Sequence, residues 1–421
     1  MTFSAPSDAN PTSGVYNLRL AQALNEAGCV AEIFVCSPRV PRMVEWVRPG
    51  LKRLRERPTE WTFEGVACHG VPGVYAHPNW VRWKLAPKWP RIAQAITRHA
   101  FAAGLGVRLD VFTPSAILAH DGVLLGQLAS RSAMMRGIPF AVIEHDTVDW
   151  NRATAMGRRY ASMGTQAKAV FGVGLPSIRA LREGLGLANA RLCPNGIARA
   201  TERQLATPRP AKYEGKRVVL CVGSPVPGKG HVELVRAFGE AAPPNSVLVL
   251  VSRAVQPEVR EAVDRLALGS RFEHLMPMAQ QDVQQLMVWA DVFAMPSHKE
   301  SFGMVYGEAI AAGTPVILTD ACGISPHIVP GVHGWVVPVG DHAALVGALR
   351  QSLSRGEKMS IQAADRRGIE DAFTWENSAR AILDGLRGEN TSEVASARSV
   401  QHDPSVASHR GGADDRAGVN R

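Results

Sequence analysis

The chain has 421 residues, 46% of them hydrophobic, which is enough for two or three domains of an ordinary globular protein. Its formal net charge of +9 makes anionic substrates, anionic membrane surfaces and nucleic acids candidate partners, but it has no nucleic-acid-binding motif, so we expect no nucleic-acid partner. No apolar run approaches the roughly 20 residues that span a bilayer, and residues 1–8 lack the features of a signal peptide, so we expect a cytoplasmic protein.

The cysteines and acidic residues give no sign of a metal site. No C-x-x-C pair is present, and the sequence contains no Asp-x-Asp metal clamp, so we expect neither a bound metal nor a cofactor. Several cysteines stand in apolar, strand-like runs and are expected to be packed thiols. The six are Cys29, Cys36, Cys68, Cys193, Cys221 and Cys322.

The chain opens with a turn, a helix and a strand. Pro11–Gly14 is a turn, apolar residues recur at helical spacing from Leu18 to Leu24, and Val30–Cys36 is predicted as a strand. A glycine turn before the first helix is typical of a doubly wound unit, which makes Gly14 a candidate binding residue. Residues 1–5 are short for the strand expected before this turn, so either that strand is abbreviated or the reading frame starts late.

Basic residues and tryptophans are interleaved between residues 37 and 98. The segment includes Arg53, Arg55 and Arg57 among leucines, and Trp80 and Trp83 next to arginine and lysine. This composition fits a surface that lies against an anionic membrane, which would place the protein at the inner face of the membrane. It equally fits a solvated basic face whose tryptophans belong to the core, and both interpretations stay open.

Two predicted strands of the first half, 116–119 and 139–143, run into polar residues. Ligands of open α/β sheets bind at the carboxyl ends of strands, so these polar residues are site candidates, although a single strand-end histidine is more often structural. The candidates are His120, Asp121, His145 and Asp146.

The second half alternates strands and helices, which predicts a mostly parallel sheet and a second doubly wound domain. Arg217–Val222 is a strand, and the loop Gly223–Gly230 leads into a helix. A glycine-rich loop with a lysine, here Lys229, can hold a phosphate, although many basic loops look similar.

The stretch Asp291–Glu308 predicts a strand, a polar turn and a helix N-terminus. Pro296 ends the strand, and helix formers begin at Met304. This geometry directs free N–H groups and the positive end of the helix dipole at a ligand above the loop, which favours a phosphate. Glu300 and Glu308 bracket the turn and can accept hydrogen bonds from sugar or ribose hydroxyls.

The wider stretch, Trp289–Asp320, resembles the donor-binding signature of the retaining glycosyltransferases of group 1, which have the GT-B fold. That signature is Glu, seven residues, Glu, followed by Ala-x-Ala-x-Gly-x-Pro-Val, and it corresponds here to Glu300, Glu308 and the residues after them. The Pro194-Asn195-Gly196 turn resembles the one that closes the first domain in this family, and Asn-Gly predicts positive φ there.

The resemblance implies an α/β protein of GT-B architecture, with two Rossmann-like doubly wound domains facing each other across a cleft. Residues 1–200 would bind the acceptor, 201–215 would be a polar linker, and 216–372 would bind the donor. Residues 373–388 would form a helix that packs back on the first domain. Residues 389–421 are polar and aperiodic, which predicts a disordered tail.

The resemblance also assigns roles to individual residues. Glu300, His145 and Lys229 are the expected catalytic residues: Lys229 would neutralise the donor diphosphate, and His145 would face the donor sugar. Ser224 stands where the family usually has an arginine, a departure that Arg253 is placed to compensate. The expected donor-binding residues are Gly14, Ser224, Lys229, Arg253, Ser301, Phe302, Gly303, Met304, Val305 and Glu308.

The implied activity is the metal-independent, retaining transfer of a hexosyl unit. The donor would be a UDP- or GDP-linked sugar, and the acceptor a glycan, a lipid-linked molecule or a small molecule, in cell-envelope or exopolysaccharide biosynthesis. The alternative is a weak or inactive nucleotide-sugar-binding partner subunit, which Ser224 and the short first strand favour. An epimerase or phosphorylase of the same fold is a more distant alternative.

Overall fold

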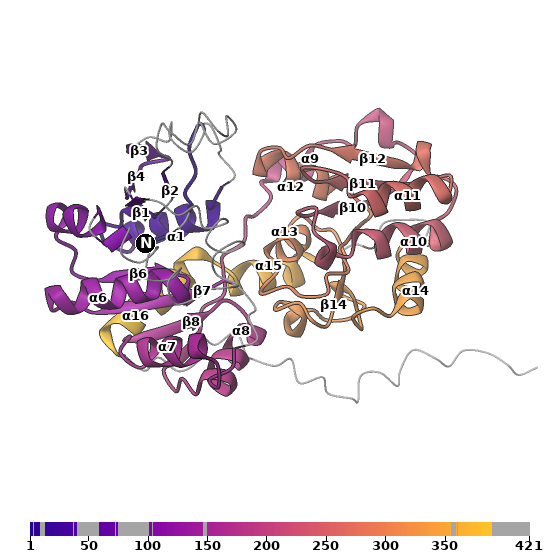
Figure 1. Cartoon of the computed structure of the whole chain (residues 1–421). Helices are drawn as coiled ribbons and strands as arrows, with labels where there is room; N and C mark the ends of the chain where they lie inside the picture. Colours follow the sequence, from indigo (N-terminus) through magenta and orange to yellow (C-terminus); the bar gives the residue numbers. More distant parts are fainter. Residues whose placement is uncertain are drawn as a thin grey trace, which may run out of the picture.

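The computed structural model describes residues 1–2, 4–8, 13–36, 38–39, 59–71, 73–74, 101–102, 104–145, 150–354, 359 and 361–389. These residues form two α/β domains, and the last helix returns from the second domain to the first (Figure 1). Several features discussed above lie outside the described residues: Asp146, the Arg53–Arg57 cluster, the tryptophans from Trp80 to Trp89, and residues 390–421.

The first domain is built mostly on parallel strands, and only the β3–β4 pair among its described strands is antiparallel. Its strands are β1 (Ile33–Val35), β2 (Pro38–Arg39), β3 (Glu60–Phe63), β4 (Val66–Gly70), β5 (Gly73–Val74), β6 (Ile117–His120), β7 (Phe140–Glu144), β8 (Ala169–Gly172) and β9 (Ala190–Leu192). Its helical elements are α1 (Val15–Glu26), η3 (Gly122–Gly126), α6 (Gln127–Arg136), α7 (Ala155–Gly164), α8 (Leu175–Arg179) and η4 (Ala180–Gly184), and residues 104–112 are also helical.

Residues 1–2 lie between two sheets of this domain. One sheet has the order β1-β4-β3, and the other has the parallel order β6-β7-β8-β9. The Thr2 N–H donates to the Phe34 carbonyl at 2.9 Å, and the His120 N–H donates to the Met1 carbonyl at 2.9 Å. Two residues therefore occupy the place of the strand expected before the Gly14 turn, and they align β1 with β6.

Two layers of helices cover the faces of the β6–β9 sheet. Side chains of a strand alternate between faces. In β7, Phe140 and Val142 pack in one core with Leu105 and Leu128, from the 104–112 helix and α6. Ala141 and Ile143 belong to the other core, on the side of α1 and of the last helix. The helices of the first layer therefore direct their exposed residues away from the sheet.

The second domain is a six-stranded sheet between helices. Its strands are β10 (Arg217–Val222), β11 (Ser246–Val251), β12 (Phe272–Leu275), β13 (Val292–Ala294), β14 (Val316–Thr319) and β15 (Gly334–Val337). Its helical elements are α9 (Glu202–Ala206), η5 (Ala211–Tyr213), η6 (Pro227–Lys229), α10 (His231–Ala241), α11 (Pro257–Arg265), η7 (Gly269–Arg271), α12 (Gln280–Trp289), α13 (Met304–Ala311), η8 (Ser325–His327), α14 (His342–Leu353) and α15 (Ala363–Ala372).

All strand pairs of this sheet are parallel, in the order β12-β11-β10-β13-β14-β15. Counted along the chain, this is the doubly wound order 3-2-1-4-5-6, in which the direction of winding reverses between β10 and β13. Ligands of such sheets bind outside the carboxyl ends of the strands at this reversal. The sheet therefore directs attention to the loops that follow β10 and β13.

The connection between the domains is ordered. Residues 201–215, expected as a polar linker, form α9 and η5 and pack on the second domain, where the Trp289 indole N–H donates to the Thr207 carbonyl at 3.1 Å. The positive φ expected at Asn195 or Gly196 is wrong, since neither residue has one. Gly196 is instead required for space, because a Cβ there would lie 2.5 Å from the ring of Trp375.

The last helix, α16 (Trp375–Arg387), packs against α1, β7 and β8 of the first domain (Figure 1). Thr374 caps it by accepting a hydrogen bond from the Asn377 N–H at 3.1 Å. The six cysteines are free thiols and all but Cys29 are buried, which confirms the expectation of packed thiols. Among the described residues, no helix is both long and apolar enough to cross a bilayer.

Candidate active site

The candidate site begins where the loops after β10 and β13 meet. The His298 N–H donates to the Gly228 carbonyl at 2.9 Å, which joins the two loops. Gly230, with φ of 70°, packs so closely on the Pro296 carbonyl that a Cβ would overlap it. Both loops follow parallel strands at the reversal of the sheet, so they form one surface at its carboxyl edge.

Lys229 and Glu300 are brought together at this junction. The Lys229 ammonium forms an ion pair with the Glu300 carboxylate, and the two side chains are 23% and 16% exposed. The Gly323 N–H donates to the Glu300 carbonyl at 3.0 Å, which fixes the backbone of the loop. The two residues expected to hold the diphosphate and the donor sugar are therefore neighbours.

Helix α13 begins at Met304, four residues after Glu300. Gly303, with φ of 93°, precedes the helix, and Phe302 is buried beneath the turn. The Tyr306 hydroxyl donates to the Met295 carbonyl at 2.5 Å and ties the helix to the end of β13. A helix leaves the N–H groups of its first turn without intrahelical acceptors, so those of Met304 and Val305 are available to an anion. Ser301 is half-buried in the same turn.

Glu308 lies on the inner side of the helix rather than at its exposed tip. Its carboxylate is buried, accepts a hydrogen bond from the Gln280 amide at 3.0 Å, and also accepts one from the Ala198 backbone of the domain connection. Burial raises the pKa of Glu308 above its ordinary value, and the two hydrogen bonds oppose that rise. In this conformation Glu308 links the second domain to the segment that connects the domains.

The carboxyl ends of β10 and β11 carry the other two donor-binding candidates. Ser224 is exposed in the loop after β10, and Arg253 is exposed after β11. The Gly223 N–H donates to the Val251 carbonyl at 3.1 Å, so the two loops begin side by side. Arg253, the residue expected to compensate for the missing arginine, therefore lies in the loop next to that of Ser224.

The first domain brings its own candidates together. His120 Nδ1 and His145 Nε2 are 2.9 Å apart in a hydrogen bond, and the two rings are stacked at an angle of 7°. The Tyr16 ring packs on His145 with centroids 4.6 Å apart, and Tyr16 lies two residues after Gly14. Burial lowers the pKa of His145 to about 4 and that of His120 well below its ordinary value, so both imidazoles are neutral near pH 7.

The backbone beside this histidine pair is unusual. Asp121 has φ of 110°, a conformation that residues with a side chain rarely adopt, and it leads into the π-helical turn η3. Next to it, the buried Glu144 carboxylate accepts a hydrogen bond from the Tyr160 hydroxyl at 3.0 Å. No hydrogen bond within the described residues joins His145 to Lys229 or Glu300, so the candidates form two clusters, one in each domain.

The two domains touch beside the loop that follows β13. Gly174, which follows β8, packs so closely against the Ser301 carbonyl that a Cβ at this position would overlap the carbonyl oxygen. The Cα of Gly323 would lie 3.2 Å from the same Cβ. This contact was missed from the sequence, because nothing near Gly174 indicates a partner 127 residues away. His231 was also missed: it directly follows the Lys229 loop, and both ring nitrogens are buried without a partner among the described residues.

These features define the class of the protein. Two doubly wound domains, a helix that returns to the first one, and a loop–helix site at the reversal of the second sheet make up the GT-B glycosyltransferase fold. Solved structures agree with this assignment. The sucrose-phosphate synthase of Thermosynechococcus elongatus superposes with a TM-score of 0.69 over 89% of this chain and 92% of its own, at 20% identity. The Anabaena protein HepE, in complex with UDP and glucose, gives a TM-score of 0.63 over 89% and 95%, at 18% identity.

Residues 202–366, most of the second domain, match the family model of glycosyl transferases group 1. The chain is 26% identical over 383 residues to a D-inositol 3-phosphate glycosyltransferase of Xylanimonas cellulosilytica, covering 88% of this chain and 90% of that protein. It is 30% identical over 223 residues to the protein of that name from Mycobacterium marinum, covering 50% and 47%. The match to this second relative thus spans about half of its length.

Proposed function

We propose that the protein is a retaining, metal-independent hexosyltransferase. It takes a hexosyl unit from a UDP- or GDP-linked sugar and transfers it to a glycan, a lipid-linked molecule or a small molecule. The group 1 domain and the GT-B fold support the transferase class. The main structural support for donor binding at this site is the ion pair between Lys229 and Glu300, next to the N-terminus of α13.

This ion pair occupies the position that the donor would take. A diphosphate bound at the α13 N-terminus would attract the Lys229 ammonium and free the Glu300 carboxylate. Glu300 would then accept hydrogen bonds from the hydroxyls of the transferred sugar. Lys229, the dipole of α13 and Arg253 supply positive charge where the leaving diphosphate becomes more negative, which is electrostatic stabilisation of the transition state.

The proposed reaction balances without a protein base. The bond between the sugar C1 and the β-phosphate oxygen breaks, and a bond from C1 to the acceptor oxygen forms on the same face of the sugar. The proton of the acceptor hydroxyl passes to the departing phosphate oxygen. Because His120 and His145 are both neutral near pH 7, His145 would serve as a hydrogen-bonding group that faces the sugar from the first domain.

The acceptor would bind the first domain, in the cytoplasm or at the inner face of the membrane, in cell-envelope or exopolysaccharide biosynthesis. The names of the relatives make an inositol phosphate one acceptor to test. The competing proposal is a partner subunit that binds the nucleotide sugar but does not transfer it. Ser224 favours that proposal, since it supplies no charge to the diphosphate.

The experiment compares nucleotide binding with transfer in the same variants. Thermal unfolding is followed with UDP, GDP, ADP and their sugar conjugates, because a ligand that binds only the folded state raises its stability. We expect one nucleotide to raise the unfolding temperature of the unsubstituted protein, the parent of the variants. Lys229→Ala should weaken the binding of that nucleotide about 10- to 100-fold, because a charged contact is lost.

Glu300→Gln separates the two proposals. It removes the partner of Lys229 but no contact to the nucleotide, so UDP or GDP should bind at least as tightly as in the parent. Transfer to the acceptor panel should fall about 10- to 100-fold, and the matched exposed change Glu258→Gln should leave it unaltered. Unaltered transfer by the Glu300→Gln variant would refute the proposed role of Glu300. Nucleotide binding by the unsubstituted protein without donor turnover would support the proposal of an inactive partner subunit.

A further inference from the structure

The proposed reaction uses only one member of the histidine pair in the first domain. His120 is the last residue of β6, and His145 directly follows β7. The two strands are parallel with His120 opposite Ile143, so His145 lies two residues beyond the partner of His120. Side chains two residues apart point to the same face of a sheet, so the register of the strands brings both imidazole rings onto one face.

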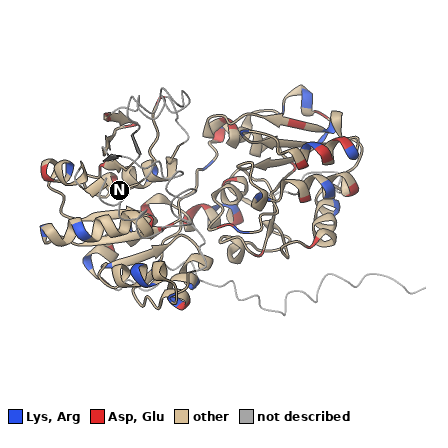
Figure 2. Cartoon of the chain, viewed as in Figure 1, with Lys and Arg blue, Asp and Glu red and all other residues tan. Residues whose placement is uncertain are grey.

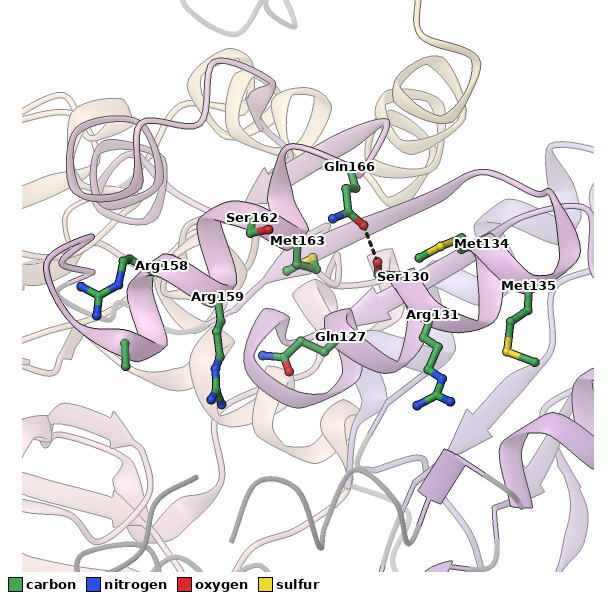
Figure 3. Close-up of a pocket in the computed structure, with 11 residues that line it drawn as sticks. Gln127, Ser130, Arg131, Met134, Met135, Arg158, Arg159, Ser162, Met163 and Gln166 are labelled. Carbon is green, nitrogen blue, oxygen red and sulfur yellow. Dashed lines mark hydrogen bonds between the residues drawn. The ribbon is translucent and has the colours of Figure 1, made fainter. Parts of the chain in front are cut away.

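That face of the sheet is the one covered by α1. Ile143 packs in the core on the side of α1 and of the last helix. Tyr16, in the first turn of α1, lies against both histidines, with ring centroids 4.6 Å from His145 and 6.4 Å from His120. A groove of about 810 Å³ between α6 and α7 lies on the opposite face of the sheet (Figure 3). The pair is therefore separate from this groove.

The strands that carry the pair offer no cation. Both β6 and β7 lack lysine and arginine, whereas the arginines of α6 and α7 (blue in Figure 2) belong to the outer layer of helices. The one acidic residue of the two strands is Glu144, and its buried carboxylate accepts a hydrogen bond from the Tyr160 hydroxyl. A neutral imidazole on such strands suits a hydroxyl of the ligand better than a phosphate.

The hydrogen bond between the rings occupies one nitrogen of each histidine. His120 contributes Nδ1 and His145 contributes Nε2, 2.9 Å apart. In a neutral imidazole one nitrogen carries a hydrogen and the other a lone pair, so this contact ties the tautomer of His145 to that of His120. The other nitrogen of His145, Nδ1, has no hydrogen-bond partner among the described residues, and the side chain is half-buried. Nδ1 is therefore the atom of His145 that a ligand can reach.

We propose that His120 is a positioning residue, which holds the ring of His145 so that Nδ1, and not Nε2, meets a hydroxyl of the transferred sugar. A hydroxyl can both donate and accept a hydrogen bond, so it suits Nδ1 in either tautomer. Without His120, the ring of His145 would be free to turn about its Cβ–Cγ bond and to place a carbon where Nδ1 had been. The role in transfer rests on the proposed function, whereas the orientation of the ring does not.

The first measurement reads the rings of the full chain without any substrate. Histidine is labelled with a nitrogen isotope, because NMR then distinguishes protonated from unprotonated ring nitrogens, and the signals absent from His145→Gln belong to His145. We expect a single tautomer of His145 in the parent and a mixture of two in His120→Phe, which keeps a flat ring but has no nitrogen. His120→Asn, whose side-chain amide reaches the place of Nδ1, should restore the single tautomer.

The second measurement is transfer from the sugar conjugate of UDP or GDP that raises the unfolding temperature of the parent. His120→Phe should lower kcat about 10-fold, the effect of one lost hydrogen bond, and should leave the KM for the nucleotide sugar within about threefold. His120→Asn should keep kcat within about threefold of the parent value. In the His145→Phe background, adding His120→Phe should change kcat by less than about twofold, because His120 acts through His145.

The matched control removes another histidine of the same domain. His69 of β4 is also half-buried, and it pairs with Glu32 at 2.6 Å rather than with a second histidine. The His69→Phe variant should leave kcat and the ring signals of His145 unaltered, even where the lost pair lowers its stability. Circular dichroism confirms that each variant is folded, and His120→Leu, with a smaller side chain, replaces His120→Phe if the larger ring prevents folding.

Three outcomes would overturn the proposal. One is a mixture of tautomers of His145 in the parent, and another is a single, unchanged tautomer in His120→Phe. The third is an equal loss of kcat when His120→Phe is added to the parent and to His145→Phe, which would make the two histidines independent. A parent that binds the nucleotide sugar but transfers nothing would instead refute the proposed function. The role of His120 in transfer would then fall with it, and the ring signals would still decide whether His120 orients His145.

Discussion

Lys229 and Glu300 of the candidate active site compensate each other's charge in the structure without a ligand. Each is mostly withdrawn from water, and an isolated charge in that position would be costly. The ion pair compensates both charges. In the proposed reaction, the donor diphosphate would replace Glu300 as the anionic partner of Lys229. Donor binding would then release Glu300 to accept hydrogen bonds from the sugar hydroxyls, which would couple recognition of the diphosphate to recognition of the sugar.

A pH dependence of stability follows from the histidine pair. Burial lowers the pKa of His145 to about 4, whereas an unfolded chain has a histidine pKa of about 6.5. Between these values the unfolded state binds a proton that the folded state excludes, so the stability from this group is complete above about pH 6.5 and is lost as the pH falls towards 4. The loss amounts to at most about 3 kcal/mol.

This prediction is checked by urea unfolding at pH 7, 5.5 and 4.5. His145→Gln keeps an amide in hydrogen-bonding reach of His120 but cannot take up a proton, so its unfolding free energy should fall less steeply with acid than that of the parent. Parallel slopes for the parent and His145→Gln would show that His145 is not held neutral by burial.

At the scale of elements, the strand–loop–helix from Asp291 to Glu308 could be predicted almost residue by residue. The signals that end the strand and begin the helix are local in the sequence: Pro296 follows β13, and α13 begins with helix-forming residues at Met304. The pairing of His120 with His145, and the burial of Glu308, could not be predicted. Each depends on how separate strands or domains align, and hydrophobic periodicity reports only which face of an element is buried, not which side chain lies opposite.

Gly196 shows the same limit and leads to a prediction about α16. The Asn195-Gly196 dipeptide predicted a turn with positive φ, which neither residue has. Gly196 is needed for another reason: a Cβ at this position would lie only 2.5 Å from the Trp375 ring. The added methyl group of Gly196→Ala should displace α16 from its packed position and lower the unfolding free energy by about 1–3 kcal/mol, the usual cost of overpacking.

The matched control for this change lies in another helix. Gly347, inside α14, has open space around its Cβ position, so Gly347→Ala should raise the unfolding free energy by up to about 1 kcal/mol through its helix propensity. Both variants are measured by chemical denaturation against the parent. A Gly196→Ala variant as stable as the parent would mean that Trp375 can move aside at little cost.

At the scale of the whole molecule, two connections set how the domains face each other. Helix α16 packs the end of the chain on the first domain, and Gly174 of the first domain contacts the Ser301 carbonyl in the loop after β13. Both connections come from residues far apart in the sequence. The proposed transfer needs groups from both domains at one sugar. The distance at which Gly174 and Ser301 hold the two domains therefore determines whether His145 and Glu300 could both reach that sugar.

Gly174 therefore provides a test of domain approach that leaves each domain intact. Its φ of −155° is extended backbone that any residue adopts, so Gly174→Ala changes only the space towards Ser301. We expect nucleotide binding by the second domain and the unfolding temperature to stay close to those of the parent, while transfer falls on the order of 100-fold, because a misplacement of about 1 Å between reacting groups has that effect. Gly269→Ala, at an open position of the second domain, should leave all three quantities unchanged. Full transfer activity in Gly174→Ala would mean that the reacting arrangement does not use this contact, and that the domains close around the donor along another surface.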